Sequence, residues 1–263
     1  MGRSSGSSRT LPLLRLLEQR YPDLESEELY ARILCGEVAV DGGVIRDPKL
    51  PVSPLAELRF SGSRPVSRGG DKLATALDAF PVSVTGKIFI DAGCSTGGFT
   101  QCLLERGAAG VHAVDVGYNL LDYSLRNDPR VTVHERTNIM DFRDPDPVPQ
   151  AAVADLSFRS IGGAAGHILD LTEEGWMIAL VKPQFEWKDP PPDFSGVVSR
   201  PEDRALILAR VAEILSGQGL GILGAVASAV PGRKGNQEYL FLLEKGPGMT
   251  VSRLLDELSL PKV

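Results

Sequence analysis

The stretch that most constrains the fold runs from Lys87 to Gly107. It begins with KIFID, an apolar run short enough for a buried strand, and ends with GGFTQCLLERG, which has helical spacing. Between them lies the turn from Asp91 to Phe99, DAGCSTGGF, whose glycines let the backbone pass close to a ligand. Open α/β sheets bind ligands at the carboxyl ends of their strands, so this turn predicts an α/β domain with a ligand site.

Strand and helix patterns alternate after this turn as far as Gly246. Strands are expected at 111–117, 131–135, 151–157, 175–183, 219–229 and 238–246, and helices at 117–128, 161–172 and 201–219. Such alternation implies a mostly parallel sheet with helices on both faces. The last two strands follow one another directly, so we expect them to pair antiparallel at one edge.

A different pattern over residues 9–60 predicts a small separate α+β domain. Residues 61–68 are rich in serine, glycine and arginine and are expected to be a linker. The α/β domain is expected over 69–247, followed by a C-terminal tail at 248–263.

The small domain is predicted to contain two amphipathic helices, a hairpin and one more strand. The helices are LPLLRLLEQRYP and SEELYARILCGE, the second with Ser26 as its N-cap and Gly36 as its stop. EVAVDGGVI alternates around Asp41-Gly42-Gly43, a hairpin signature, and AELRF is the further strand. This order resembles the RNA-binding S4 domain, in which the phrase before the hairpin typically reads GxVxVNG. The alternative is a packing module, because acidic residues outnumber basic ones in this stretch.

Composition limits the classes of partner. The net charge of −6 disfavours bulk nucleic-acid binding, so any RNA function must rest on a local basic patch. No apolar run reaches the length of a membrane span and no secretory signal is predicted, which favours a cytoplasmic protein with no membrane partner. Three cysteines, Cys35, Cys94 and Cys102, have no metal-binding spacing and are expected to be reduced, with no bound metal.

The glycine turn itself distinguishes between cofactors. Its spacing is not GxGxxG, which argues against a nicotinamide dinucleotide. It resembles instead the methyltransferase phrase D/E-x-G-x-x-x-G, which accommodates S-adenosylmethionine (AdoMet). The expected cofactor residues of the turn are Asp91, Gly93, Ser95, Thr96, Gly97, Gly98 and Phe99. Asp115 ends the next strand, where a carboxylate accepts hydrogen bonds from ribose hydroxyls; the alternative is a turn or capping role.

Seven phrases in order over residues 66–242 resemble the TlyA family, whose members are called both hemolysins and ribosomal RNA methyltransferases. The phrases are VSRGGDKL, DAGCSTGGFT, VDVGYNLLDYSLRNDPRV, ERTNI, ADLSFRSI, VKPQFE and GNQEYLF. The catalytic domain of that family is similar to the FtsJ/RrmJ-type ribose 2′-O-methyltransferases, which have a Rossmann-like sheet. The resemblance implies a catalytic tetrad of Lys72, Asp155, Lys182 and Glu238. It also implies that Asn138 forms hydrogen bonds with the adenine edge of AdoMet, although an isolated asparagine there is more often a loop residue.

Ribose methylation explains these residue types. A 2′-hydroxyl is a weak nucleophile, and a lysine acts as its base when burial and a second cation lower its pKa. Lys182 would be the base, and Lys72 the second cation, which also steadies the alkoxide. Asp155 and Glu238 would orient the two ammonium groups, and Asp155 would also lie near the sulfonium of AdoMet. Taken singly, each residue has a structural alternative, such as a solvated strand-end lysine or an edge-strand charge.

Two further features would serve an RNA substrate. The proline-rich segment 186–200 directly follows Lys182 and would form a lid over the acceptor, or else a plain surface loop. Basic residues are expected to gather at the edge of the site: Arg64, Arg68, Lys72, Arg159, Lys188, Arg200, Arg233 and Lys234.

These observations favour an AdoMet-dependent methyltransferase of ribosomal RNA, acting on the RNA or on a ribosomal subunit. One alternative is a non-catalytic ribosome-assembly factor that retains the AdoMet fold. Another is a hemolysin or other membrane-active protein, but the chain has no long apolar or strongly amphipathic segment. Ribose is favoured over base because ADLSF, and no Asn-Pro-Pro-Tyr-like phrase, ends the fourth strand.

Overall fold

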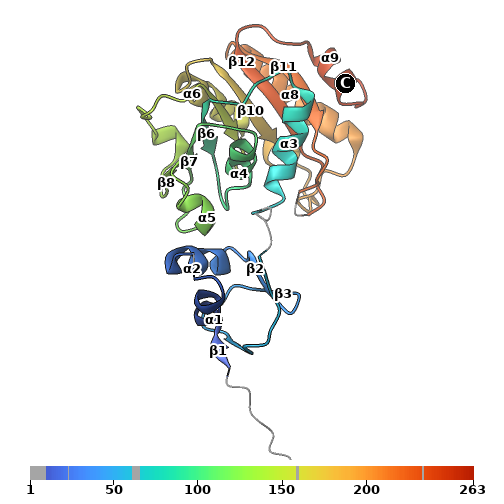
Figure 1. The fold of residues 1–263 in the computed structure, drawn as a ribbon. Coiled ribbons are helices and arrows are strands. Elements are labelled where there is room, and N and C mark those ends of the chain that lie inside the picture. The colour runs from blue at the N-terminus through green and yellow to red at the C-terminus, as the bar shows by residue number, and fades with distance from the viewer. Residues whose placement is uncertain (1–9, 23, 61–65, 158–159, 233) are drawn as a thin grey trace, which may run out of the picture. The chain divides into compact units, whose positions relative to one another are not determined.

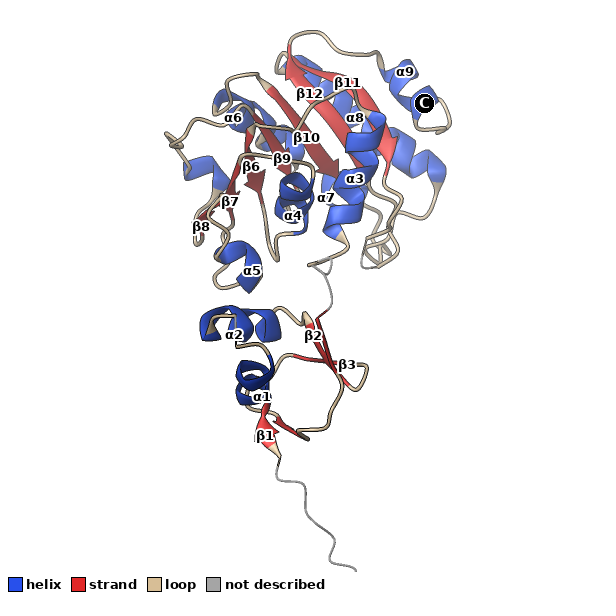
Figure 2. Ribbon diagram, viewed as in Figure 1, coloured by secondary structure: helices blue, strands red, loops and turns tan. Residues whose placement is uncertain are grey.

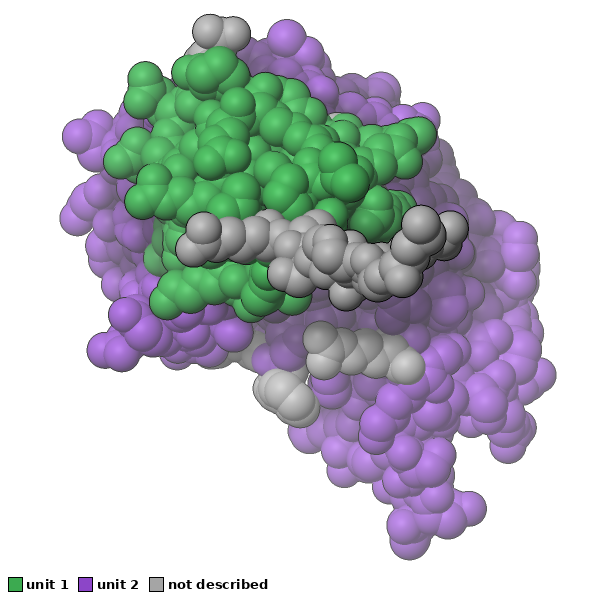
Figure 3. All heavy atoms as spheres, turned by 60° about the horizontal axis from the view of Figure 1, so that its bottom comes forward, with its two compact units in different colours: residues 1–65, 122–127 green, residues 66–121, 128–263 purple. Residues whose placement is uncertain are grey.

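The computed structural model describes residues 10–22, 24–60, 66–157, 160–232 and 234–263. Most of the predicted linker therefore lies outside the described residues. The chain divides into two compact units, one made of residues 1–65 with 122–127 and the other of the remaining residues (Figure 3). Each unit is described by itself below.

The smaller unit packs two helices and short strands around a leucine-rich core (Figure 1). Its elements are β1 (Leu11–Pro12), α1 (Leu13–Arg20), α2 (Ser26–Leu34), β2 (Val38–Val40), β3 (Gly43–Ile45), β4 (Pro51–Val52) and β5 (Leu58–Phe60). The order β3-β2-β5 forms an antiparallel sheet, and β1 pairs with β4. Leu13, Leu17, Leu29 and Ile33 are fully buried, because their helical spacing turns one face of each helix inward.

The predicted hairpin is confirmed, whereas the predicted N-cap is wrong. Asp41 and Gly42 both have positive φ, 49° and 82°, the backbone of a two-residue turn that matches the twist of the paired strands. Ser26 is the first helical residue, and Glu25 precedes it without a capping bond. The Ser26 hydroxyl instead donates to Glu18 over 2.6 Å, so a contact between the two helices replaces the cap.

Among the described residues, the larger unit contains one seven-stranded sheet in the order β11-β12-β10-β9-β6-β7-β8 (Figure 2). The strands are β6 (Ile88–Ala92), β7 (Gly110–Val114), β8 (Val131–His134), β9 (Ala151–Ala154), β10 (Trp176–Val181), β11 (Leu220–Ala227) and β12 (Tyr239–Lys245). β12 pairs antiparallel with β10 and β11, and the other pairs are parallel. This is the α/β fold that the sequence predicts, including the antiparallel edge.

Helices cover both faces of this sheet. They are α3 (Gly69–Ala79), α4 (Gly98–Glu105), η1 (Ile139–Asp141), η2 (Ile161–Gly163), α6 (Ala165–Asp170), α7 (Pro183–Glu186), α8 (Pro201–Gly217) and α9 (Val251–Glu257). The short helix α5 (Tyr123–Arg126) belongs to the smaller unit. Side chains of α6, α8 and α9 share one core with alternate residues of β6, β9, β10 and β12. α3 and α4 contact each other, and they contact β11, β12 and β7 from the opposite face.

Two segments differ from the prediction. The helix expected over 117–128 is reduced to α5, because Asn119 has a φ of 55° and Asp122 caps a new helix that starts at Tyr123, its side chain accepting from the Ser124 N–H. The residues expected only as a C-terminal tail contain α9, whose Leu254 is buried in the main core together with Leu258, the residue that follows the helix. The hydroxyl of Thr250 caps that helix, so the segment carries its own start signal.

The strand order locates the place where a ligand can bind. β6 lies between β7 and β9, and the chain leaves β6 toward β7 and β8 before returning on the other side to β9 and β10. The loops that follow β6 and β9 therefore diverge, which leaves a crevice at their carboxyl ends.

Candidate active site

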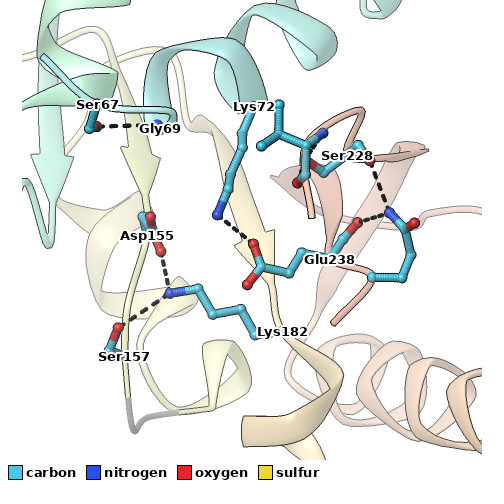
Figure 4. A network of polar contacts seen from close by, with 10 residues as sticks. Ser67, Gly69, Lys72, Asp155, Ser157, Lys182, Ser228 and Glu238 are labelled. Carbon is cyan, nitrogen blue, oxygen red and sulfur yellow. Dashed lines mark hydrogen bonds and ion pairs between the residues drawn. The ribbon is translucent and has the colours of Figure 1, made fainter. Parts of the chain in front are cut away.

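A cavity of about 1010 Å³ opens at this crevice, and a smaller one of about 210 Å³ adjoins it. Both are lined by Lys72, Gly93, Ser95 and Asp155, so they form one continuous depression. The depression lies within the larger unit, and Figure 4 shows the polar residues at its centre. It is large enough for more than one drug-sized ligand.

The glycine turn brings the backbone of three segments together. Gly93 has a φ of 83°, and a Cβ there would lie 2.6 Å from the carbonyl oxygen of Asp155. A Cβ on Gly98 would lie 2.3 Å from the Ser67 hydroxyl, so the start of α3 approaches the start of α4. Gly97, with a φ of 96°, begins α4 from the left-handed region. Close approach thus requires glycine at positions 93 and 98, and the left-handed backbone favours it at position 97.

Asp91 is fully buried at the base of the smaller cavity. One carboxylate oxygen accepts a 2.6 Å hydrogen bond from the Thr100 hydroxyl, and the other has no partner among the described residues. The pKa of Asp91 is raised to about 7, chiefly by burial and also by the nearby Asp155 carboxylate, against the opposing effect of the Thr100 hydrogen bond. An unpartnered carboxylate in such a place suits a cationic ligand group, which would supply both the missing donor and the missing charge.

Asp115 and Asn138 lie at the edge of the larger cavity, after β7 and β8. The two Asp115 oxygens accept backbone hydrogen bonds from Ser95 at 2.8 Å and Gly117 at 2.7 Å. These bonds fix the carboxylate while leaving acceptor capacity for a ligand diol. The Asn138 side-chain oxygen accepts from the backbone N–H of Met140 at 3.1 Å and so caps η1, an additional role that the sequence did not indicate.

Lys72 and Glu238 form an ion pair at 2.5 Å between α3 and the residue before β12 (Figure 4). Their side chains are only 13% and 4% exposed, so the pair is shielded from water. Glu238 fits because Gly232 lacks a side chain: a Cβ there would lie 2.4 Å from its carboxylate oxygen. Removing one partner of such a buried pair costs about 3–5 kcal/mol, because the other charge is left uncompensated.

Lys182 and Asp155 form a second ion pair across the ends of β10 and β9. The Lys182 ammonium also donates to the Ser157 hydroxyl over 3.3 Å and lies 5.7 Å from the centre of the Phe185 ring. Lys182 is 8% exposed, whereas the Asp155 side chain is 26% exposed and faces both cavities. The structure thus brings the four tetrad residues into one cavity as two lysine–carboxylate pairs (Figure 4).

Residues predicted for the glycine turn reach the same depression. Asp91, Gly93, Ser95, Thr96, Gly98 and Phe99 line the smaller cavity, whereas Gly97 acts through its backbone conformation. Cys94, the intervening residue, is buried, and burial raises the pKa of its thiol, so it stays protonated. The three cysteines are free.

Several supporting residues were missed, although the quoted motifs contain them. Ser157 belongs to ADLSF, Gln184 and Glu186 belong to VKPQFE, and Asn236 belongs to GNQEYLF. Glu186 accepts a 2.9 Å hydrogen bond from the backbone N–H of Ile161, and burial raises its pKa. These motifs are the sequence signal for the supporting residues, but the resemblance implies a role for only one or two residues of each.

The expected basic patch is described in part. Arg64, Arg159 and Arg233 lie outside the described residues. Arg68 lines the smaller cavity and Lys234 the larger one. Lys188 and Arg200 are exposed near the two ends of the segment after α7, but Arg200 lies 3.7 Å from Glu202 and 3.9 Å from Asp203, which offset its charge.

The doubly wound sheet with an antiparallel edge, its glycine turn and its acidic residue after β7 define a Rossmann-like methyltransferase. Residues 65–245 match the family of FtsJ-like methyltransferases. The chain is 42% identical over 215 residues to the 16S/23S rRNA (cytidine-2′-O)-methyltransferase TlyA of Mycobacterium tuberculosis, covering 79% of this chain and 80% of that protein. It is 40% identical over 179 residues to hemolysin A of Brachyspira hyodysenteriae, covering 66% of this chain and 75% of the relative.

A solved structure extends the likeness to nearly the whole chain. That structure, of a protein described as a hemolysin from Streptococcus thermophilus, is 31% identical and superposes with a TM-score of 0.66. It covers 95% of this chain and 98% of its own. The chain therefore belongs to the TlyA family of FtsJ-like methyltransferases.

Among the described residues, no helix combines the length and apolar character needed to cross a membrane. In the same residues, no group of three or more histidine, cysteine, aspartate or glutamate side chains is arranged to hold a metal ion.

The close approach at Gly93 gives a test of the turn. Gly93→Ala should destabilise the protein by about 2–4 kcal/mol, because it adds a clash with Asp155 to the cost of a left-handed alanine. Gly86→Ala is the matched control: Gly86 has a φ of 76°, but nothing lies within 4 Å of a Cβ there. Urea unfolding of both variants measures the difference, and equal losses would mean that the approach to Asp155 imposes no constraint.

Proposed function

We propose that this protein transfers a methyl group from AdoMet to a ribose 2′-hydroxyl of ribosomal RNA. The observation that carries the proposal is the pairing of two shielded lysines with two carboxylates in one cavity beside the glycine turn. The names of the relatives support the substrate, since the Mycobacterium tuberculosis protein is a 16S/23S rRNA (cytidine-2′-O)-methyltransferase.

The cavity suits AdoMet on two structural grounds. The unpartnered oxygen of Asp91 offers an acceptor for the α-ammonium group, and the absence of side chains at Gly93 and Gly98 leaves room for the chain that carries it. Asp115 would accept hydrogen bonds from the ribose hydroxyls of the cofactor. Asn138 would lie at the adenine edge, and Val116, Ile139 and Leu156 supply the apolar contact.

AdoMet, when bound, supplies an electrophilic methyl group on a sulfonium that leaves as a neutral thioether. Lys182 in its amine form would accept the proton of the 2′-hydroxyl as the oxygen attacks that methyl group. Asp155 and Ser157 fix the position of the Lys182 nitrogen, and Asp155 would also compensate the positive charge of the donor. Lys72, oriented by Glu238, would stabilise the developing negative charge on the oxygen. Holding the reactants in line would supply much of the acceleration, up to about 7–11 kcal/mol.

The smaller unit is proposed to bind RNA, as its S4-like order of helices and hairpin suggests. Its ion pairs between Arg15 and Glu18, and between Arg32 and Glu28, leave less free positive charge than the count of arginines implies. Recognition by this unit would therefore depend on shape as well as on charge.

The proposed base can be tested by substitution. Lys182→Ala should lower methyl transfer at least about a hundredfold and leave AdoMet affinity unchanged, because a general base contributes that much to the rate. The measurement is incorporation of label from radioactive AdoMet into ribosomal subunits that lack the modification, with AdoMet affinity measured by calorimetry. Lys245→Ala is the control, since Lys245 lies at the opposite end of β12 and pairs with Asp170. Retained turnover in Lys182→Ala would show that another group accepts the proton.

The proposed ribose contact gives a binding test. Asp115→Ala should weaken AdoMet binding at least about tenfold, because it removes both acceptor oxygens and leaves the ribose hydroxyls unpaired. Asp115→Asn keeps one acceptor oxygen and the shape of the side chain, so its loss should be smaller. Calorimetry with AdoMet measures both variants, and wild-type affinity in Asp115→Ala would remove this assignment.

The raised pKa of Asp91 predicts how AdoMet binding depends on pH. With a folded pKa of about 7, Asp91 is mostly neutral at lower pH and ionises as the pH rises, and only the ionised form pairs with the α-ammonium. Ionisation of Asp91 alone should therefore raise AdoMet affinity about eightfold between about pH 6 and about pH 7.5. Partial deprotonation of the α-ammonium, whose pKa is about 7.7–8.0, reduces the expected rise to about five- to sixfold. The Asp91→Asn variant should bind AdoMet more weakly, and its affinity should no longer depend on pH in this range. An unchanged pH dependence in that variant would show that another group causes it.

A further inference from the structure

The cavity has a second half that the proposed cofactor contacts do not occupy. Asp115 and Asn138 follow β7 and β8, at one end of the sheet. Gln184 and Phe194 follow β10 and Lys234 precedes β12, so they line the same cavity from the other end. The Lys182–Asp155 pair lies between the two halves, after β10 and β9.

The segment that carries Phe194 is held in place from two sides. Asn236, which is 3% exposed, accepts a 2.9 Å hydrogen bond from the Val198 N–H and donates one of 2.8 Å to the Gly196 carbonyl. The Phe194 N–H donates to the carbonyl of Pro191 over 3.0 Å, within a run of three prolines that restricts the backbone. The aromatic ring is therefore positioned before any substrate arrives.

The Phe194 ring packs against the Trp187 ring, which fixes its orientation. Its centroid lies 5.2 Å from that of Trp187 in an edge-on arrangement with an interplanar angle of 62°. The residue is half-buried and lines the cavity. Gln184 lines the same wall, and its side-chain oxygen is buried with no hydrogen-bond partner among the described residues.

We propose that Phe194 stacks against the nucleobase of the acceptor nucleotide and that Asn236 positions the segment for this contact. The inference rests on the proposed function. Lys182 is 8% exposed, so a 2′-hydroxyl can reach it only if its nucleotide enters the cavity, away from the stacked RNA. An extruded base loses its stacking neighbours, and an aromatic side chain replaces them whichever base it is.

The competing occupant of this wall is the cofactor itself. The residues proposed to hold AdoMet lie after β6, β7 and β8, whereas the wall lies after β10 and before β12. The strands β9 and β6 therefore lie between the wall with Phe194 and the proposed adenine position along the sheet, which favours the RNA as the occupant of this wall.

The test compares three substitutions of Phe194 in the full-length protein. Phe194→Ala should raise the KM for ribosomal subunits about tenfold and leave the affinity for AdoMet unchanged, since base–aromatic stacking is worth about five- to a hundredfold in binding. Phe194→Trp, which keeps an aromatic face, should stay near the wild type. Phe194→Leu keeps apolar bulk without such a face and should behave like Phe194→Ala.

Asn236→Ala tests the positioning role. It should raise the same KM, and the double variant with Phe194→Ala should be no worse than the poorer single variant, because both changes act on one contact. AdoMet affinity and melting temperature are measured for every variant, and a value near the wild type shows that the domain is folded. If Asn236→Ala does not fold, the three Phe194 variants decide the proposal.

Binding of the same subunits in the presence of S-adenosylhomocysteine provides a readout that does not require turnover. A wild-type KM and wild-type subunit affinity in Phe194→Ala would overturn the stacking proposal while leaving the methyltransferase proposal intact. A loss of AdoMet affinity without a loss of subunit affinity would overturn it in favour of the cofactor. If the wild-type protein methylates neither subunit, the proposed function fails, and the Phe194 series in the binding assay still decides the contact.

Discussion

The site depends on keeping four charged groups at the sheet edge with little access to water. Lysine and carboxylate side chains are costly to bury unless they are paired, and here each lysine has its own carboxylate: Lys72 with Glu238, and Lys182 with Asp155. The pairs draw on α3, β9, β10 and the start of β12, so the edge of the sheet must be correctly assembled before any of the charges is compensated. The same two ion pairs therefore determine both the stability of this region and the geometry of the site.

Glycine makes this arrangement possible at two places. At Gly93 the turn passes so close to Asp155 that no side chain fits, and at Gly232 the same is true beside Glu238. Gly93 thus approaches the backbone of Asp155, and Gly232 approaches the carboxylate of Glu238, so each glycine lies beside one acidic residue of the two lysine pairs. The cavity lined by both acidic residues stays open for ligands.

The two halves of the cavity differ in the groups that they offer to a ligand. The half proposed to bind the cofactor contains backbone turns and carboxylates with unused acceptor capacity, such as Asp91 and Asp115. The half proposed to bind the acceptor contains an aromatic ring, Phe194, whose segment is hydrogen-bonded to Asn236. A small cationic cofactor and a large anionic RNA would thus meet at Lys182 from opposite ends of the same sheet.

The sequence by itself determined the α/β class and the antiparallel pairing of the last two strands, because strand and helix periodicity are local signals. The motif phrases predicted four charged residues that the structure places in one cavity. The sequence did not determine the short α5, since the left-handed Asn119 and the cap at Asp122 outweighed helical spacing. Only the tertiary structure decided which lysine pairs with which carboxylate, and that Asn236 clamps a segment about 40 residues earlier in the chain. Those contacts join residues that are far apart in the sequence. They form only when the strands are assembled side by side, so no local sequence pattern can predict them.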